Sequence, residues 1–222
     1  WTQVSGTHNV NGSTTTFASN PASFGNGSPA GGTWTYSFVF TTPGVYQYQC
    51  DPHAAMMIGT INVVTLTPGA IAFTGITSDA PDTYQFVAMR AIPGGTVLKF
   101  TDISWGPTDW YNTGLTTGEQ DTVIYVAPAA GLAAGTLVTL SDDGNGGTSV
   151  SGGGVASGVL AGISASGDHV FAFQGSKNAP AFIAAIGNAP FISTGSALST
   201  SSYLPAGLTL GVHAMAIASA HV

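Results

Sequence analysis

Residues that bind soft metal ions lie close together near position 50. Cys50 is followed three positions later by His53, and Met56 and Met57 lie within seven residues of the cysteine. A further histidine, His8, lies well upstream. Two imidazoles and one thiolate in a plane, with a weak axial thioether, form a copper site suited to carrying single electrons. We therefore expect one copper ion to be held by His8, Cys50, His53 and a methionine, either Met57 or Met56.

Plainer interpretations of the same residues exist. A lone cysteine is often a small buried hydrophobe, and His8 taken alone could be an ordinary loop histidine. Cys50 is the only cysteine of the chain, so it cannot form an intrachain disulfide. Zinc is the main competing metal, since one cysteine and two histidines can bind it tetrahedrally. The methionines favour copper, because a thioether is a ligand of copper rather than of zinc.

The segments that position these residues have the pattern of β-strands. Apolar and polar residues alternate over residues 33–40, with Trp34, Tyr36, Phe38 and Phe40 on one side. Pro43 and Gly44 predict a turn, which leads into a strand over residues 45–50 that ends at the cysteine. Residues 59–64 predict the following strand.

Three motifs together resemble the plastocyanin and pseudoazurin branch of the cupredoxins. They are His8-Asn9-Val10, the run from Pro43 to His53, and Met57-x-Gly59. The resemblance covers residues 1–64 and implies a Greek-key copper domain there. It also implies that Asn9 ties its loop to the Cys50 loop near Asp51. Pro52 would stiffen the loop, His53 would reach the surface and pass electrons, and Ala54, Ala55 and Met56 would form an apolar docking patch.

Two features depart from that family. The loop after His53 is short: relatives often place the methionine five residues on, whereas Met56 and Met57 follow at three and four. Met57-x-Gly59 favours Met57, while the short-loop amicyanins would favour Met56. Family domains also begin with two strands before the tryptophan that Trp1 matches. We expect those strands to be disordered, absent from this chain or supplied by a second chain through strand addition.

The rest of the chain predicts a second antiparallel β-sandwich. Residues 65–69 indicate a linker, and short strands without intervening helices then recur. They are expected over residues 70–77, 84–90, 96–102, 121–126, 136–141, 169–174 and 208–217. Residues 70–222 resemble the lamin-tail domains of secreted bacterial surface proteins, on the stretches 70–75, 79–82, 92–102, 132–136, 167–175 and 204–208. The resemblance implies a spacer or adhesive module and transfers no catalytic residue.

Composition narrows the range of functions. Charged residues make up 6% of the chain, and only three are basic, which excludes a surface that neutralises phosphates. Every apolar stretch is interrupted well before about 18 residues, so no transmembrane helix is expected. The Gly- and Ser-rich residues 142–158 predict an exposed loop, and residues 181–186 are the sole weak helix candidate. Trp105, Trp110 and Tyr111 could bind a glycan or protein, but the pattern favours aromatics that cap the core.

Enzymatic motifs fail on inspection, so we expect no enzyme. The sequence around Ser164 misses the nucleophile elbow at its last position, and residues 144–149 lack the strand–loop–helix frame of a phosphate loop. Asp142 and Asp143 lack the full calcium-loop pattern. A multicopper oxidase would need many more histidines than His169, His213 and His221, which are dispersed.

Two hypotheses follow for the function. The first is an extracellular, cell-surface or periplasmic electron carrier with one copper ion and a redox protein partner, borne on a β-sandwich. The second is a structural or adhesive surface protein, or filament subunit, that assembles by strand exchange and in which the copper domain is architectural. The low charge and the high Gly, Ser and Thr content suit the second hypothesis.

Overall fold

The structure is a computed structural model that describes residues 1–40, 42, 44–78, 80–111, 121–160 and 162–217. Regular structure in these residues is β apart from one 3-10 turn, η1 (Asp51–His53), which confirms the all-β fold class. The chain divides into two compact units, Trp1–Thr65 and Leu66–Val222. The division falls inside the stretch expected to be a linker. Each unit is described by itself, and their identity as separate domains stays a prediction.

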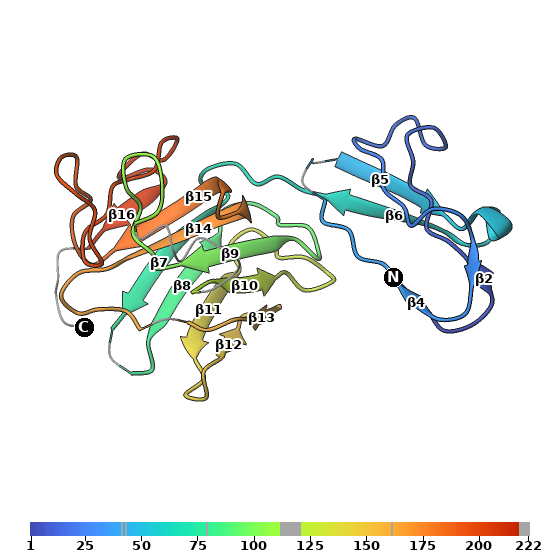
Figure 1. Cartoon of the computed structure of the whole chain (residues 1–222). Coiled ribbons are helices and arrows are strands. Elements are labelled where there is room, and N and C mark those ends of the chain that lie inside the picture. The colour runs from blue at the N-terminus through green and yellow to red at the C-terminus, as the bar shows by residue number, and fades with distance from the viewer. Residues whose placement is uncertain (41, 43, 79, 112–120, 161, 218–222) are drawn as a thin grey trace. The chain divides into compact units, whose positions relative to one another are not determined.

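Unit 1 consists of three antiparallel strand pairs (Figure 1). Two of the pairs are short: β1 (Thr2–Gln3) with β4 (Trp34–Thr35), and β2 (Thr7–His8) with β3 (Ala30–Gly31). The third pair is longer and joins β5 (Gly44–Gln49) to β6 (Ile58–Val63). The expected turn at Pro43 and Gly44 includes position 43, which lies outside the described residues. Gly44 begins β5.

Aromatic side chains fill the interior of unit 1. Val10, Phe24 and Tyr46 are buried, and partly buried aromatics that include Trp1, Trp34 and Phe40 pack against them. The alternation expected over residues 33–40 holds for Trp34, Tyr36 and Phe40, which are partly buried, whereas Phe38 is exposed; only Trp34–Thr35 is a strand. Trp1 also exchanges backbone hydrogen bonds with Tyr36. The aromatic core therefore holds together segments that carry few sheet hydrogen bonds.

Unit 2 consists of two sheets, which can be followed in Figure 1. One has the strand order β13-β10-β9-β14-β15-β16 and the other β12-β11-β8-β7. The strands of the first are β9 (Val97–Thr101), β10 (Val123–Val126), β13 (Val155–Ser157), β14 (His169–Ser176), β15 (Ala179–Gly187) and β16 (Ala214–Ala216). The strands of the second are β7 (Ile71–Thr77), β8 (Thr83–Ala88), β11 (Leu137–Asp142) and β12 (Thr148–Ser151). Neighbouring strands pair antiparallel, except that β15 and β16 are parallel.

Rings from both sheets meet in the core of unit 2. Phe73, Tyr84 and Phe86 of the second sheet lie with their ring centroids 5.4–6.3 Å from Phe100 of β9 or from one another. On β14, Phe171 and Phe173 instead pack with Trp110, Leu208 and Ala214 on the outer face. Strand β14 is therefore buried on both faces. Trp110 is 2% exposed and Trp105 packs against the same cluster, so both belong to the core, as the sequence favoured, whereas Tyr111 is 38% exposed.

The structure refines three sequence expectations for this part of the chain. Residues 181–186, the weak helix candidate, lie within strand β15, whose buried end has no polar side. Residues 142–158 are mostly exposed but contain β12 and β13. The strand expected over residues 208–217 shortens to β16. No helix in the described part of the chain is long and apolar enough to cross a membrane.

Candidate metal centre

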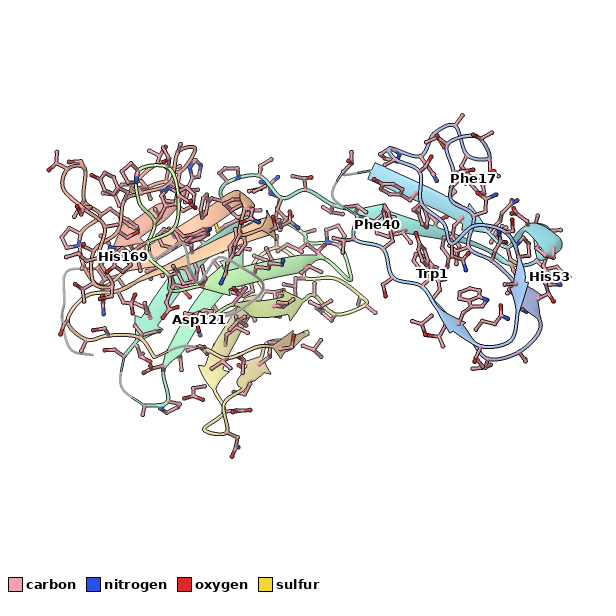
Figure 2. All side chains as sticks on the ribbon, viewed as in Figure 1. Trp1, Phe17, Phe40, His53, Asp121 and His169 are labelled. Carbon is pink, nitrogen blue, oxygen red and sulfur yellow. The ribbon has the colours of Figure 1, made fainter. Side chains whose placement is uncertain are left out.

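Three separate segments of unit 1 carry the side chains of the expected site. His8 ends β2, Cys50 follows directly after β5, and His53 ends the turn η1. Pro52 lies in the first positions of that turn, where its fixed φ suits the 3-10 conformation. Figure 2 shows His53 at the end of the β5–β6 ribbon, beside the turn. The β5–β6 pairing thus delivers Cys50 and His53, and the short β2–β3 pair delivers His8.

The structure brings three of the expected ligands together. The Cys50 Sγ lies 3.5 Å from the Nδ1 of His8 and 3.5 Å from the Nδ1 of His53. The two imidazole rings lie 4.8 Å apart between centroids, at an interplanar angle of 44°. Cys50 is 3% exposed, and both histidines are half-buried. Since His8 and Cys50 are 42 positions apart, this contact is a property of the tertiary structure.

Backbone hydrogen bonds close the loop between Cys50 and β6. The N–H of His53 donates to the carbonyl of Cys50, and the N–H groups of Met56 and Met57 both donate to the carbonyl of His53. The N–H of Cys50 then donates to the carbonyl of Met57 at 2.9 Å. This last bond places the Met57 backbone beside the cysteine.

The two methionines differ in their exposure. Met56 is 81% exposed, whereas Met57 is 45% exposed and directly precedes β6. A thioether ligand has to turn inward toward the thiolate, so the more exposed Met56 is the poorer candidate. The assignment of Met57 as the fourth ligand stays a prediction that this difference favours.

The bond expected between Asn9 and the cysteine loop is present. The backbone N–H of Asp51 donates to the Asn9 Oδ1 at 2.8 Å, and the Asn9 Nδ2 donates to the Asp51 Oδ2 at 2.8 Å. Asn9 is 4% exposed whereas Asp51 is exposed, so this link between the His8 and Cys50 segments is partly buried. It fixes the segment that follows one ligand to the segment that follows another.

Two further residues at the site were missed by the sequence reasoning. The Asn11 Nδ2 and the Gln49 Nε2 both donate to the Asp51 Oδ1, at 2.8 and 3.1 Å. Bonds from Asn11, Asn9 and Gln49 hold the pKa of Asp51 below its usual value. The sequence carried a signal for Asn11, because Asn9 and Asn11 are two positions apart and such residues on an extended segment point to the same side. For Gln49 the only signal was its position next to Cys50.

The donor set fits a metal ion. An ion about 2.0–2.3 Å from a nitrogen and a thiolate sulfur holds those two atoms about 3.5 Å apart, as is found here for both histidines. His8, Cys50 and His53 are the group of potential ligands found in the described part of the chain. Zinc and copper agree equally well with these distances. The choice between them depends on donor chemistry, because thiolate and thioether together favour copper.

The other described histidines, His169 and His213, belong to unit 2. His169 is fully buried in unit 2, with its ring centroid 4.6 Å from that of Phe191. Burial holds the pKa of His169 below its usual value, so the neutral ring is favoured. His213 also lies in unit 2, where it is half-buried. His221 lies outside the described residues.

Comparison with known families agrees with this geometry. Residues 2–64 match the copper binding proteins of the plastocyanin/azurin family. This match spans β1 to β6 and includes all four expected ligands. No curated protein sequence and no solved structure shows a significant match to the chain. The copper-binding, cupredoxin-like nature of unit 1 is therefore supported, whereas the lamin-tail likeness of residues 70–222 stays a prediction.

Proposed function

We propose that this protein is an electron carrier that binds one copper ion through His8, Cys50, His53 and Met57. The observation that carries the proposal is the convergence of two imidazole nitrogens on the Cys50 sulfur, each at 3.5 Å. The location that we propose is outside the cytoplasm, at the cell surface or in the periplasm, where unit 2 would position the copper-binding unit.

The residues would set the properties of the site as follows. Copper, when bound, supplies a one-electron couple between Cu(I) and Cu(II). Cys50 and Met57 offer soft donors that suit Cu(I), and the imidazoles accept both oxidation states. The hydrogen bonds that close the Cys50–Met57 loop resist movement of these donors. Four protein ligands would leave no open position for a substrate, unlike a catalytic metal site. We therefore propose an electron carrier and not an enzyme.

An apolar surface surrounds the exposed edge of the site. Ala54, Ala55 and Ile58 are exposed together with both methionines, and Ile58 is 66% exposed. Asp51 is the only formal charge in residues 1–64. We propose that a redox partner docks on this patch next to His53 and that electrostatic steering is weak. Electron transfer measured by stopped flow should then change less than about threefold between low and high salt. A steep salt dependence would contradict docking at this patch.

The decisive experiment is to add Cu(II) to the metal-free protein and record visible absorption and electron paramagnetic resonance spectra. The proposal predicts an intense thiolate-to-copper band and a narrow copper hyperfine splitting. Cys50→Ser should lose both, because the hydroxyl cannot replace the thiolate. Ser104→Ala, in unit 2, serves as the control and should keep both. A weak, ordinary Cu(II) spectrum from the unsubstituted protein would overturn the proposal.

A second candidate function is assembly into a polymer by strand addition. Strand β5 pairs with β6 along one edge. On its other edge Gln49 is bridged to Asn11 and the Gln47 backbone is bonded to the Asn20 side chain, so among the described residues only the Val45 end of this edge is open. Val39 and Val45 are 80% and 52% exposed near this region. Light scattering over a concentration series would detect assembly, and Val45→Lys should abolish it. A protein that stays monomeric throughout would exclude this function.

A further inference from the structure

The Asp51 carboxylate is bound by three side-chain amides. Asn9 donates to its Oδ2, and Asn11 and Gln49 donate to its Oδ1, at distances of 2.8–3.1 Å. Asp51 is not among the residues whose donor atoms cluster around Cys50 in the described part of the chain. Its oxygens are thus engaged with amides, and its role differs from that of a ligand.

The amides come from both sides of the site. Asn9 follows His8 directly, whereas Gln49 precedes Cys50 directly. Asn11 and Gln49 also exchange two backbone hydrogen bonds, of 2.8 and 3.0 Å. The carboxylate therefore joins the His8 segment to the Cys50 segment, next to the point where their backbones already pair. Movement of either segment would have to break charge-assisted hydrogen bonds, which are stronger than neutral ones.

The charge itself lies one residue from Cys50 and is the only one in residues 1–64. A negative charge near a metal favours the more positive oxidation state. The amide N–H dipoles aimed at the carboxylate oppose part of its field. Asp51 is solvent-exposed, so water also reduces its effect.

We propose that Asp51, with Asn9, Asn11 and Gln49, is a positioning element that holds the ligand segments in place before the metal binds and biases the bound copper toward Cu(II). This inference rests on the proposed function, since the bias requires a copper site. It adds a role for three residues that bind no metal. Asp51 carries the charge, and Asn11 and Gln49 moderate it.

Two substitutions separate this role from a merely structural one. Asp51→Asn keeps the shape and removes the charge, so the preference for Cu(II) over Cu(I) should fall about three- to tenfold. That change raises the reduction potential by about 30–60 mV for a one-electron couple. Gln49→Met removes the hydrogen bond from the Gln49 Nε2 to the Asp51 Oδ1 and leaves the charge less compensated. The reduction potential of Gln49→Met should therefore fall, by a smaller amount than the rise expected for Asp51→Asn. General loosening of the site would move both potentials in the same direction.

The metal-free protein provides an independent readout. The N–H groups of Cys50 and Asp51 are hydrogen-bonded in the closed loop, so their exchange with deuterium should be slow and should quicken severalfold in Asp51→Asn. Asp142→Asn removes a carboxylate from unit 2 and serves as the charge control, with no effect on the potential or on exchange in unit 1.

The outcomes distinguish the two proposals. If the unsubstituted protein gives no thiolate-to-copper band, the proposed function fails and the copper bias fails with it. If the band is present but both variants shift the potential in the same direction, or neither shifts it, only the present inference fails. Opposite shifts, together with faster exchange in Asp51→Asn, support it.

Discussion

At the scale of single residues, the site depends on a few contacts around Cys50. The thiol is 3% exposed and lies between two half-buried imidazoles, which leaves His53 with an edge toward solvent. Burial of Cys50 slows its unwanted oxidation, because susceptibility to oxidation increases with solvent exposure. The remaining question at this scale is the axial ligand, which the exposures of Met57 and Met56 address.

The axial ligand is tested by two matched substitutions. Met57→Leu should change the thiolate-to-copper band and raise the reduction potential, because a thioether ligand is replaced by an apolar group of similar size. Met56→Leu should leave both unchanged, since that side chain is 81% exposed. Absorption spectra and voltammetry of the two variants decide the matter, and the reverse pattern would assign Met56.

At the scale of elements, the strands of unit 2 show where sequence patterns are reliable. The predicted strands at 70–77, 84–90, 96–102, 121–126, 136–141 and 169–174 all correspond to observed strands, with ends shifted by a few residues. Strand β8 keeps a regular alternation of buried and half-buried residues, which is the pattern that period-2 reasoning detects. Strand β15 has five consecutive buried residues at its end, and such a run does not distinguish a strand from a helix.

Gly158, which directly follows β13, provides a prediction at this scale. Gly158 has φ of 94°, and a Cβ placed there would lie 2.2 Å from the carbonyl oxygen of Thr122. Gly158→Ala should therefore lower the free energy of unfolding by about 3 kcal/mol or more, from a backbone clash in addition to strain. Chemical denaturation measures this value.

Gly144→Ala is the matched control for that substitution. Gly144 also has positive φ, of 73°, but nothing lies within 4 Å of the added Cβ. Its cost should be only the conformational strain, about 1 kcal/mol. Equal losses for the two variants would show that strain rather than the close approach of the Thr122 carbonyl dominates.

At the scale of the whole molecule, buried carboxyls make stability depend on pH. Burial raises the pKa of Asp102 to about 6 and that of Asp168 to about 7, against ordinary values of 3.8. Between the ordinary and the raised values, the folded protein binds more protons than the unfolded chain. The contribution of Asp102 and Asp168 to the free energy of unfolding is therefore lost as the pH rises from about 4 to about 7. His169 opposes this trend below its ordinary value of 6.5, because its pKa is lowered.

A comparison with Asp102→Asn isolates one of these groups. The contribution of His169 is common to both proteins, whereas the pKa of Asp168 is raised in part by the Asp102 charge, so the difference reports on Asp102 together with its charge coupling to Asp168. The unsubstituted protein should lose about 2 kcal/mol more than Asp102→Asn between pH 4 and pH 7. Urea unfolding at a series of pH values measures this difference. Parallel profiles would show that Asp102 does not titrate between those limits.

The sequence by itself determined the all-β class, the types and order of the expected ligands, and the location of the candidate site in residues 1–64. These follow from local patterns: alternation along strands, and the close spacing of Cys50, His53 and the methionines. The tertiary structure decided what depends on long-range contacts. It brought His8 to Cys50 across 42 positions and placed Asn11 and Gln49 on the Asp51 carboxylate. It also made β15 a strand, because burial on both faces comes from packing and leaves no periodic trace along the chain.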